Sequence, residues 1–253
     1  MIRSRLLGTP VGRVAWRDSA MIEAPRLAES GAAEGTVVIA ETQTAGRGRL
    51  GRTWVSEPGV GLYFSLVLRP NVTAARLPIL TLAVGLGVAE GIEQACRVEC
   101  DLRWPNDVLL NERKCAGILV ETLSADCGTL YAIVGVGVNV NQVTMPDELA
   151  DIATSARIET GCEYDREEVL HQAVQGIERY YGVFLDEGAE AIVPAFALKS
   201  SYVRDRRVAV LNGSSETLGT TAGLDPHGVL LLQTDEGHVE PILAGSVRPI
   251  EGR

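Results

Sequence analysis

The sequence is poor in residues that bind metals or form disulfides. It has three histidines among 253 residues, and none stands at zinc-ligand spacing from a cysteine. The cysteines are odd in number and no two form a CxxC pair: Cys96, Cys100, Cys115, Cys127 and Cys162. A chain of this length does not need disulfides to stabilise its core. The sequence therefore predicts free thiols in a reducing compartment and argues against a zinc site.

Positive charge is also scarce. The chain has 23 lysines and arginines against 33 acidic residues, which gives a formal net charge of −10. A general nucleic-acid binder needs many cations to neutralise phosphates. The charge balance argues against that class, although it remains compatible with a local basic site for a phosphorylated small molecule.

Long hydrophobic segments are missing as well. Residues 1–16 include basic side chains but no apolar run of the kind found in signal peptides. The longest apolar run, Leu77–Ala89, is interrupted by Pro78 and Thr81, and it is shorter than the ~18 residues that a membrane span needs. The sequence predicts a cytoplasmic protein that does not contact a membrane.

The remaining pattern predicts an α+β fold without internal repeats. Hydrophobic periodicity predicts strands at Thr36–Ala40 and Leu62–Leu68 and helices at Arg76–Cys96 and Asp165–Leu185. Asp165 and Glu168 have the spacing of a capping box at the start of the second helix. Further apolar stretches predict strands at Val98–Trp104, Val108–Leu110, Ala116–Glu121 and Leu130–Val140. Because the links between these strands are short, we expect antiparallel pairing.

After Ser200 the sequence changes to short strands separated by tight turns. Five strands are predicted, at Arg206–Leu211, Thr217–Leu224, Val229–Gln233, His238–Ile242 and Ser246–Ile250. A segment of about fifty residues with this pattern is typical of a small β-barrel. The sequence therefore predicts two domains, residues 1–200 and residues 201–253.

One stretch, AGRGRLGR (residues 45–52), combines glycine with arginine. Gly46, Gly48 and Gly51 have the spacing of a dinucleotide-binding loop, but the context of that loop is missing. Five mostly polar residues, ETQTA, separate the predicted strand from the first glycine, Pro58 stops any following helix, and no acidic residue lies about 20 residues further on. A Walker loop is also excluded, because no Gly-Lys-Ser/Thr follows.

The glycines of this loop instead allow its backbone to approach a ligand closely. Arg47, Arg49 and Arg52 supply planar, permanently charged donors for a phosphate or a carboxylate. Trp54 follows and could stack on a ring. The alternative is a solvated turn whose arginines bind nothing.

Two further stretches carry candidate ligand-binding residues. The first is Arg103-Trp-Pro-Asn-Asp107 with Lys114 seven residues later, and its alternatives are ordinary turn chemistry and a surface lysine. The second is Gly135-Val-Gly-Val-Asn139 within an apolar strand. Glycines weaken a strand, so they indicate that a ligand or another backbone packs closely there, or else a bulge or tight sheet packing.

Together these segments resemble biotin protein ligases. The matching stretches are ETQTAGRGRLGRTW, RWPNDVLLNERKCAGILVE and VGVGVNVN, in matching order and spacing, and the resemblance runs from about Trp16 to Ile250. It implies a mixed, mostly antiparallel sheet with helices, related to class II aminoacyl-tRNA synthetases, plus an SH3-like barrel. It also implies that the carboxylate of biotin attacks the α-phosphate of ATP, giving biotinyl-5′-AMP and pyrophosphate. A lysine of a biotin carboxyl carrier protein would then accept the biotinyl group.

The resemblance implies roles for particular residues. The implied catalytic residues are Lys114, Arg47 and Arg49. The implied biotin contacts are Ser19, Ala20, Met21, Gln43, Gly46, Arg47, Gly48, Arg49, Lys114, Gly117 and Gly135. The implied ATP contacts are Arg49, Arg52, Trp54, Asn106, Lys114 and Asn139, with Mg²⁺ as the counter-ion of ATP and Asp107 as a metal ligand.

The sequence departs from the family in one place near the implied biotin pocket. Ser19-Ala20-Met21 stands where Ser-Thr-Asn is usual, which removes two polar groups. Only about fifteen residues precede the resemblance, too few for the helix-turn-helix domain of DNA-binding members, so we expect a ligase that does not bind DNA. Two alternatives stay open: a lipoate ligase of the related family, and a regulator that binds biotin or its adenylate without transferring it. A monomer and a homodimer are both compatible with the sequence.

Overall fold

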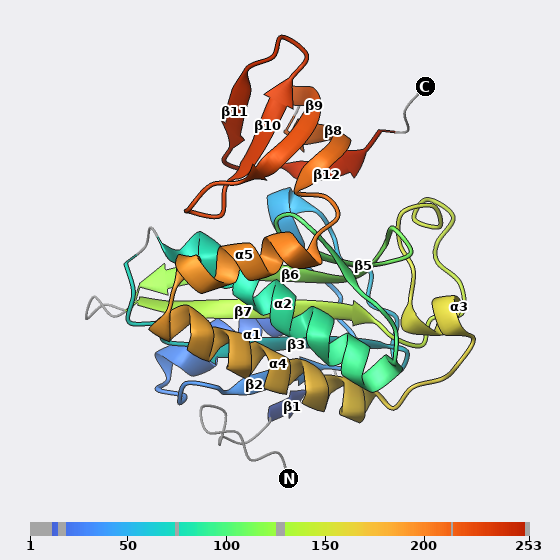
Figure 1. The fold of residues 1–253 in the computed structure, drawn as a ribbon. Helices are drawn as coiled ribbons and strands as arrows, with labels where there is room; N and C mark the ends of the chain where they lie inside the picture. The colour runs from blue at the N-terminus through green and yellow to red at the C-terminus, as the bar shows by residue number, and fades with distance from the viewer. Residues whose placement is uncertain (1–11, 15–18, 74–75, 125–129, 214, 251–253) are drawn as a thin grey trace.

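The computed structural model describes residues 12–14, 19–73, 76–124, 130–213 and 215–250. These residues form two sheets (Figure 1). The larger sheet carries helices on both faces, and the smaller one packs at one end of the helical layer.

The larger sheet has seven strands in the order β1-β2-β3-β7-β6-β5-β4. Their bounds are β1 Gly12–Val14, β2 Val37–Ala40, β3 Gly61–Leu68, β4 Asp101–Arg103, β5 Asp107–Leu110, β6 Arg113–Ser124 and β7 Leu130–Asn139. β1 and β2 run parallel, and every other neighbouring pair is antiparallel. The prediction of a mixed, mostly antiparallel sheet is confirmed.

Three helices cover one face of this sheet: α2 (Leu77–Cys96), α4 (Arg166–Asp186) and α5 (Ala189–Lys199) (Figure 1). α2 and α4 pack closely because both have glycine at the contact. A Cβ built on Gly87 would lie 2.5 Å from the backbone of Gly176. Of the described helices, only α2 is long and apolar enough to span a membrane, and 72% of its apolar window is buried inside the fold, as expected of a core helix.

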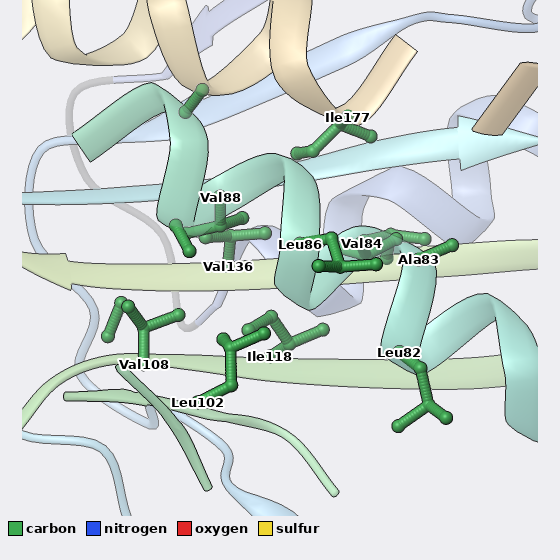
Figure 2. Close-up of a cluster of buried hydrophobic side chains, with 14 of the residues drawn as sticks. Leu82, Ala83, Val84, Leu86, Val88, Leu102, Val108, Ile118, Val136 and Ile177 are labelled. Carbon is green, nitrogen blue, oxygen red and sulfur yellow. The ribbon is translucent and has the colours of Figure 1, made fainter. Parts of the chain in front are cut away.

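The main core lies between the sheet and these helices (Figure 2). Ile118 of β6 and Val136 of β7 point from the sheet towards Val84 and Val88 of α2. A smaller core lies on the opposite face, where α1 (Ala20–Glu29) packs on β2, β3 and β7. Because side chains of a strand alternate between faces, the neighbours of Ile118 and Val136 face α1 and the loop after β2.

The smaller sheet has five antiparallel strands in the order β11-β10-β9-β8-β12. Their bounds are β8 Arg204–Asn212, β9 Ser215–Leu224, β10 Leu230–Thr234, β11 Val239–Ile242 and β12 Ser246–Pro249. All five predicted strands are confirmed. The terminal strands β11 and β12 do not pair among the described residues, so the sheet is not a closed barrel there.

The smaller sheet is docked firmly on the helical layer. The indole N–H of Trp104 donates to the carbonyl of Gly228 (2.9 Å). Gly228 has φ +75, and a Cβ there would come within 2.8 Å of Leu82 on α2. Val208 of β8 and Leu232 of β10, both in the smaller sheet, belong to the same buried core as α2. The two sheets therefore share one hydrophobic interior.

Several sequence predictions were wrong in detail. Val98 and Cys100 lie outside β4, because the backbone N–H of Cys100 donates to the Glu93 carboxylate (2.9 Å) instead of to a strand. The capping box at α4 is incomplete. Asp165 caps the helix by accepting from the N–H of Glu167, whereas Glu168 accepts from the Gln172 side chain. Three helices were not predicted: α1, α3 (Ala156–Thr160) and α5.

The described cysteines are free thiols, as predicted, and Cys127 lies outside the described residues. Burial raises the pKa of Cys96 to about 12. Burial, together with the neighbouring Cys115, also raises the pKa of Cys100 well above its usual range. Protonated, buried thiols are poor nucleophiles and poor metal ligands, so these side chains act as core residues.

Candidate active site

Segments far apart in the sequence meet in a small cavity on the α1 face of the larger sheet. The cavity has a volume of about 50 Å³. Its lining comes from the start of α1, the loop after β2, the turn between β4 and β5, and strands β3, β6 and β7: Ser19, Ala20, Met21, Gln43, Arg47, Gly48, Arg49, Trp54, Phe64, Ser65, Asn106, Lys114, Gly117, Ile118, Leu119, Gly135, Val136 and Gly137. Ligand pockets usually enclose about 300–1,000 Å³. A ligand must therefore displace some of this lining.

Three glycines form the floor of the cavity. A Cβ on Gly137 would lie 2.5 Å from the Trp54 ring, and one on Gly117 would lie 2.8 Å from that ring and 2.9 Å from Lys114 Nζ. At the other end, a Cβ on Gly135 would lie 2.4 Å from the sulfur of Met21. Any side chain here would fill the cavity, so the glycines predicted to allow close approach do so.

The N-terminus of α1 is fixed against the loop after β2. Ser19 caps the helix by accepting from the N–H of Met21. The Ser19 hydroxyl (2.8 Å) and the Ala20 N–H (3.0 Å) both donate to Oε1 of Gln43. Since Oε1 accepts both bonds, Nε2 is the part of the Gln43 amide that can donate to a ligand. Ala20 and Met21 add only apolar side-chain surface.

The glycine-arginine loop folds back on itself as a tight hairpin. The N–H of Trp54 donates to the carbonyl of Gly46 (2.9 Å), and the N–H of Gly48 donates to the carbonyl of Arg52 (2.7 Å). A Cβ on Gly46 would lie 2.3 Å from the Trp54 carbonyl oxygen, which requires glycine at this position. Leu50 at the tip has φ +57 and is half exposed. Positive φ is costly for leucine, and strained loops of this kind are common where a ligand is held.

The three arginines of the loop reach different parts of the fold. Arg47 forms an ion pair with Glu121 of β6 (2.9 Å). Arg49 donates to Oδ1 of Asn106 (3.0 Å), and Arg52 donates to the hydroxyl of Ser246 in the smaller sheet (2.7 Å). Burial lowers the pKa of Arg49, and the field of Asp107 opposes that shift. A guanidinium in a protein still stays charged at neutral pH. The loop therefore brings fixed cations to the cavity.

Lys114 is held by its backbone and by its charge. Its N–H donates to the carbonyl of Ile152, and its own carbonyl accepts from the N–H of Thr154 (both 2.9 Å). Its Nζ lies 2.5 Å from Oδ1 of Asp107, and 5.4 Å from the centroid of the Trp54 ring. The backbone bonds fix the strand position of Lys114, and Asp107 and the Trp54 ring define the position of its ammonium group.

Asp107 serves as the counter-ion of two cations. Its Oδ1 pairs with Lys114 and its Oδ2 with Arg103 (2.9 Å). Burial alone would raise the pKa of Asp107, but Lys114 and Arg103 outweigh it and lower the pKa. Because cations occupy both oxygens, this arrangement gives no support to Asp107 as a metal ligand. Within the residues that the structure describes, no cluster of three or more acidic, histidine or cysteine side chains could hold a metal.

A second and larger hollow of about 750 Å³ adjoins the cavity at Trp54 and Lys114. It is lined by the loop after β2, by strands β4 to β7 with the turn between β5 and β6, by the segment between β7 and α3, and by β12: Arg52, Thr53, Trp54, Val55, Glu57, Arg103, Asp107, Glu112, Arg113, Lys114, Asn139, Gln142, Thr144, Met145, Pro146, Glu148, Leu149, Asp151, Ile152, Ala153, Arg248 and Pro249. Its size suits a nucleotide, and its arginines suit phosphates.

The structure thus brings most of the predicted site residues together. All predicted biotin contacts except Gly46 line the small cavity. Of these two hollows, Arg52 and Asn139 line the larger one, and Trp54 and Lys114 line both. Asn139 is held by donating to the carbonyl of Thr154 (2.9 Å).

Sequence reasoning missed Ser65, Glu121 and Arg248. Ser65 offered a signal, since it is the one small polar side chain in the apolar stretch LYFSLVL.

Comparison with known proteins identifies the family of the chain. Residues 20–139 match the Biotin/lipoate A/B protein ligase family, and residues 205–247 match the biotin protein ligase C terminal domain. The bifunctional ligase/repressor BirA of Bacillus subtilis (strain 168) is 40% identical over 220 residues, which cover 85% of this chain and 66% of BirA. The chain therefore spans about two thirds of the length of that relative.

Relatives of similar length match over most of their sequence. The biotin–[acetyl-CoA-carboxylase] ligase of Paracoccus denitrificans is 33% identical over 225 residues, which cover 87% of this chain and 92% of that protein. The structure of the biotin protein ligase from Aquifex aeolicus in complex with biotin and ATP superposes with a TM-score of 0.83 and 36% identity. That match covers 96% of this chain and 100% of the other. The chain therefore belongs to the biotin protein ligase family.

Proposed function

We propose that this protein activates biotin with ATP as biotinyl-5′-AMP and transfers the biotinyl group to a lysine of a biotin carboxyl carrier protein. The observation that carries the proposal is the meeting of two hollows at Lys114. The small cavity has an apolar, glycine-lined floor, and the larger hollow is rich in arginine. A carboxylate bound in the small cavity and a phosphate bound in the larger hollow would meet at the ammonium group of Lys114.

The first step joins two anions, so it needs fixed positive charge. One carboxylate oxygen of biotin attacks the α-phosphorus of ATP, a new O–P bond forms, and pyrophosphate leaves. Lys114 lies between the hollows and Arg49 beside Asn106, so both can stabilise the charge that develops on the phosphoryl oxygens. Asp107 does not react. It holds Lys114 in place, with Arg103 as its second partner.

The second step forms an amide. The neutral amine of the acceptor lysine attacks the acyl carbon of the mixed anhydride, and AMP leaves with the bonding electrons. Until the acceptor arrives, the anhydride must be kept from water. The hairpin of residues 46–54 covers the cavity, and its glycines allow it to open for the ligand and close again.

Mg²⁺ enters this proposal as the counter-ion of the ATP phosphates. It supplies charge neutralisation on the triphosphate. The described side chains do not assemble a metal site of their own, and Asp107 is already paired with two cations. We therefore assign no protein ligand to the ion.

The finer features of the resemblance belong to the same proposal. They are a class II synthetase-like architecture for residues 1–200, an SH3-like fold for residues 201–253, a cytoplasmic location and a carboxylase carrier protein as partner. The end of α5 at Lys199 and the start of β8 at Arg204 are compatible with the proposed division.

The deciding experiment measures pyrophosphate release from ATP and Mg²⁺ with biotin, with lipoate and with neither. A biotin carboxyl carrier domain is then added and its lysine is examined for label. Biotin-dependent release followed by labelling is the expected result. Release that depends on lipoate instead would make the protein a lipoate ligase. Adenylation of biotin without labelling would favour a regulator.

A further inference from the structure

The segment that joins α5 to the smaller sheet is fastened to β4, the end strand of the larger sheet. Among the described residues, β4 pairs with β5 and with no further strand. The hydroxyl of Ser200 donates to the carbonyl of Leu102 in β4 (2.5 Å). The N–H (2.8 Å) and the hydroxyl (2.5 Å) of Ser201 both donate to the carboxylate of Asp101. These bonds fix the end strand, and with it the backbone of Arg103.

Tyr202 follows in this segment and is fully buried beside two arginines. The guanidinium carbon of Arg103 lies 5.7 Å from the centroid of the Tyr202 ring, and that of Arg206 in β8 lies 5.0 Å from it. Arg206 also donates to the carboxylate of Glu112 (2.5 Å). In the part of the chain that the structure describes, the Tyr202 hydroxyl has no hydrogen-bond partner. The aromatic face is therefore what Tyr202 offers to these cations.

A continuous chain of contacts leads from the Tyr202 ring to the ammonium group of Lys114. Arg103, which lies over the ring, donates to Oδ2 of Asp107 from both Nε (3.3 Å) and Nη2 (2.9 Å). The other carboxylate oxygen of Asp107 lies 2.5 Å from Lys114 Nζ. Tyr202 itself lines neither the small cavity nor the larger hollow. Any effect of Tyr202 on the reaction must therefore pass through Arg103.

The charge of Arg103 matters to Lys114 because the two cations share one carboxylate. The Arg103 side chain is mostly buried, so water screens its interaction with Asp107 only weakly. When Arg103 is in place, it offsets part of the negative charge of Asp107. Without it, the whole charge of Asp107 would face Lys114 and weaken the field of the ammonium group at a phosphoryl oxygen. A displaced Arg103 would thus reduce the charge stabilisation that the first step needs.

We propose that Tyr202 is a positioning residue, whose ring holds the Arg103 guanidinium against Asp107 and so keeps the charge of Lys114 available to the phosphate. This inference rests on the proposed function. A planar guanidinium can stack on an aromatic face while its N–H groups reach a carboxylate. An aliphatic side chain would fill part of the same space without attracting the cation.

The test compares Tyr202→Phe and Tyr202→Leu with the parent in biotin-dependent pyrophosphate release. Tyr202→Phe keeps the ring, so its kcat should stay near the parent value. Tyr202→Leu removes the ring, and its kcat should fall about tenfold, on the order of one buried cation–π contact. The KM values for biotin and ATP should stay near those of the parent, because Tyr202 lines neither hollow and the lost charge stabilisation acts in the transition state.

Tyr181→Leu is the matched control for the loss of a buried tyrosine. Tyr181 of α4 is almost fully buried in the same core, but its hydroxyl bonds Glu34 (2.7 Å) and its ring stacks on Phe184. Both leucine variants should lower the unfolding temperature, because each leaves a cavity. Only Tyr202→Leu should lower kcat. An unchanged kcat in Tyr202→Leu, or an equal fall in Tyr181→Leu, would show that the Tyr202 ring merely fills the core.

A double-mutant cycle with Arg103→Met shows whether Tyr202 acts through Arg103. Arg103→Met should lower kcat by itself, and Tyr202→Leu should then add little, because the cation that the ring holds is gone. Two independent falls that multiply would overturn this route. A parent enzyme that releases no pyrophosphate with biotin would defeat the proposed function and this inference with it. An active parent whose kcat is unaffected by Tyr202→Leu would refute this inference alone.

Discussion

Replacing Asp107 by asparagine removes the charge that holds Lys114 and Arg103 together. The three side chains are mostly buried, with exposed fractions of 17% for Asp107, 27% for Lys114 and 12% for Arg103. Removing one partner of a buried ion pair typically costs about 3–5 kcal/mol, because the remaining charge is left without compensation. Since Lys114 keeps some contact with solvent, we expect the lower end, about 3 kcal/mol. At ~2–4 °C per kcal/mol for a chain of this size, the unfolding temperature should fall by about 6–12 °C.

The pH dependence of this difference tests the same reasoning. The two cations outweigh burial and lower the folded pKa of Asp107 below its unfolded value of about 3.9. The stabilisation from this carboxylate is therefore complete above the unfolded pKa and is lost as the pH falls through the folded pKa. Thermal or urea unfolding measures the difference in stability between the parent and Asp107→Asn. This difference should be constant from about pH 5 to 7, a range that begins about one unit above the unfolded pKa, and it should shrink below about pH 5.

The control is the double variant Asp107→Asn with Lys114→Met. If Asp107 mainly compensates Lys114, adding the second substitution should recover part of the lost stability. A fall of less than about 1 °C for Asp107→Asn, or no coupling in this cycle, would refute the assignment of Asp107 as a structural counter-ion.

Three other substitutions test the proposed mechanism. Lys114→Ala should lower kcat for pyrophosphate release by ~10²-fold or more while the circular dichroism spectrum is retained, and unchanged turnover would remove Lys114 from the mechanism. Arg49→Gly should increase the release of free biotinyl-AMP, measured as labelling of bystander lysines, because the loop loses its bond to Asn106. Leakage at the parent level would show that this bond does not close the site. Gly137→Ala places a methyl group within 2.5 Å of Trp54, so it should raise the KM for ATP while the unfolding temperature changes little, whereas an unchanged KM would place ATP away from the Trp54 ring.

The sequence by itself determined every strand except β1, together with the two long helices and the motifs of the site. These depend on local patterns: apolar periodicity, the glycine spacing of residues 46–51, and the short turn of Asn111 and Glu112 that places Lys114 on β6. The pattern misled where a side chain outside the stretch decided the geometry. The alternation of Val98 and Cys100 resembles a strand, but the carboxylate of Glu93 takes the backbone N–H of Cys100.

Only the tertiary structure decided how the site residues interact. Arg49 meets Asn106 across 57 positions of sequence, and Arg52 meets Ser246 across 194. No local pattern encodes such pairings, because they arise when segments far apart in the sequence pack together. The same holds for Asp107, which pairs with two cations, and for Ser65, whose hydroxyl is an ordinary feature of a strand until the glycines of β7 leave a cavity above it.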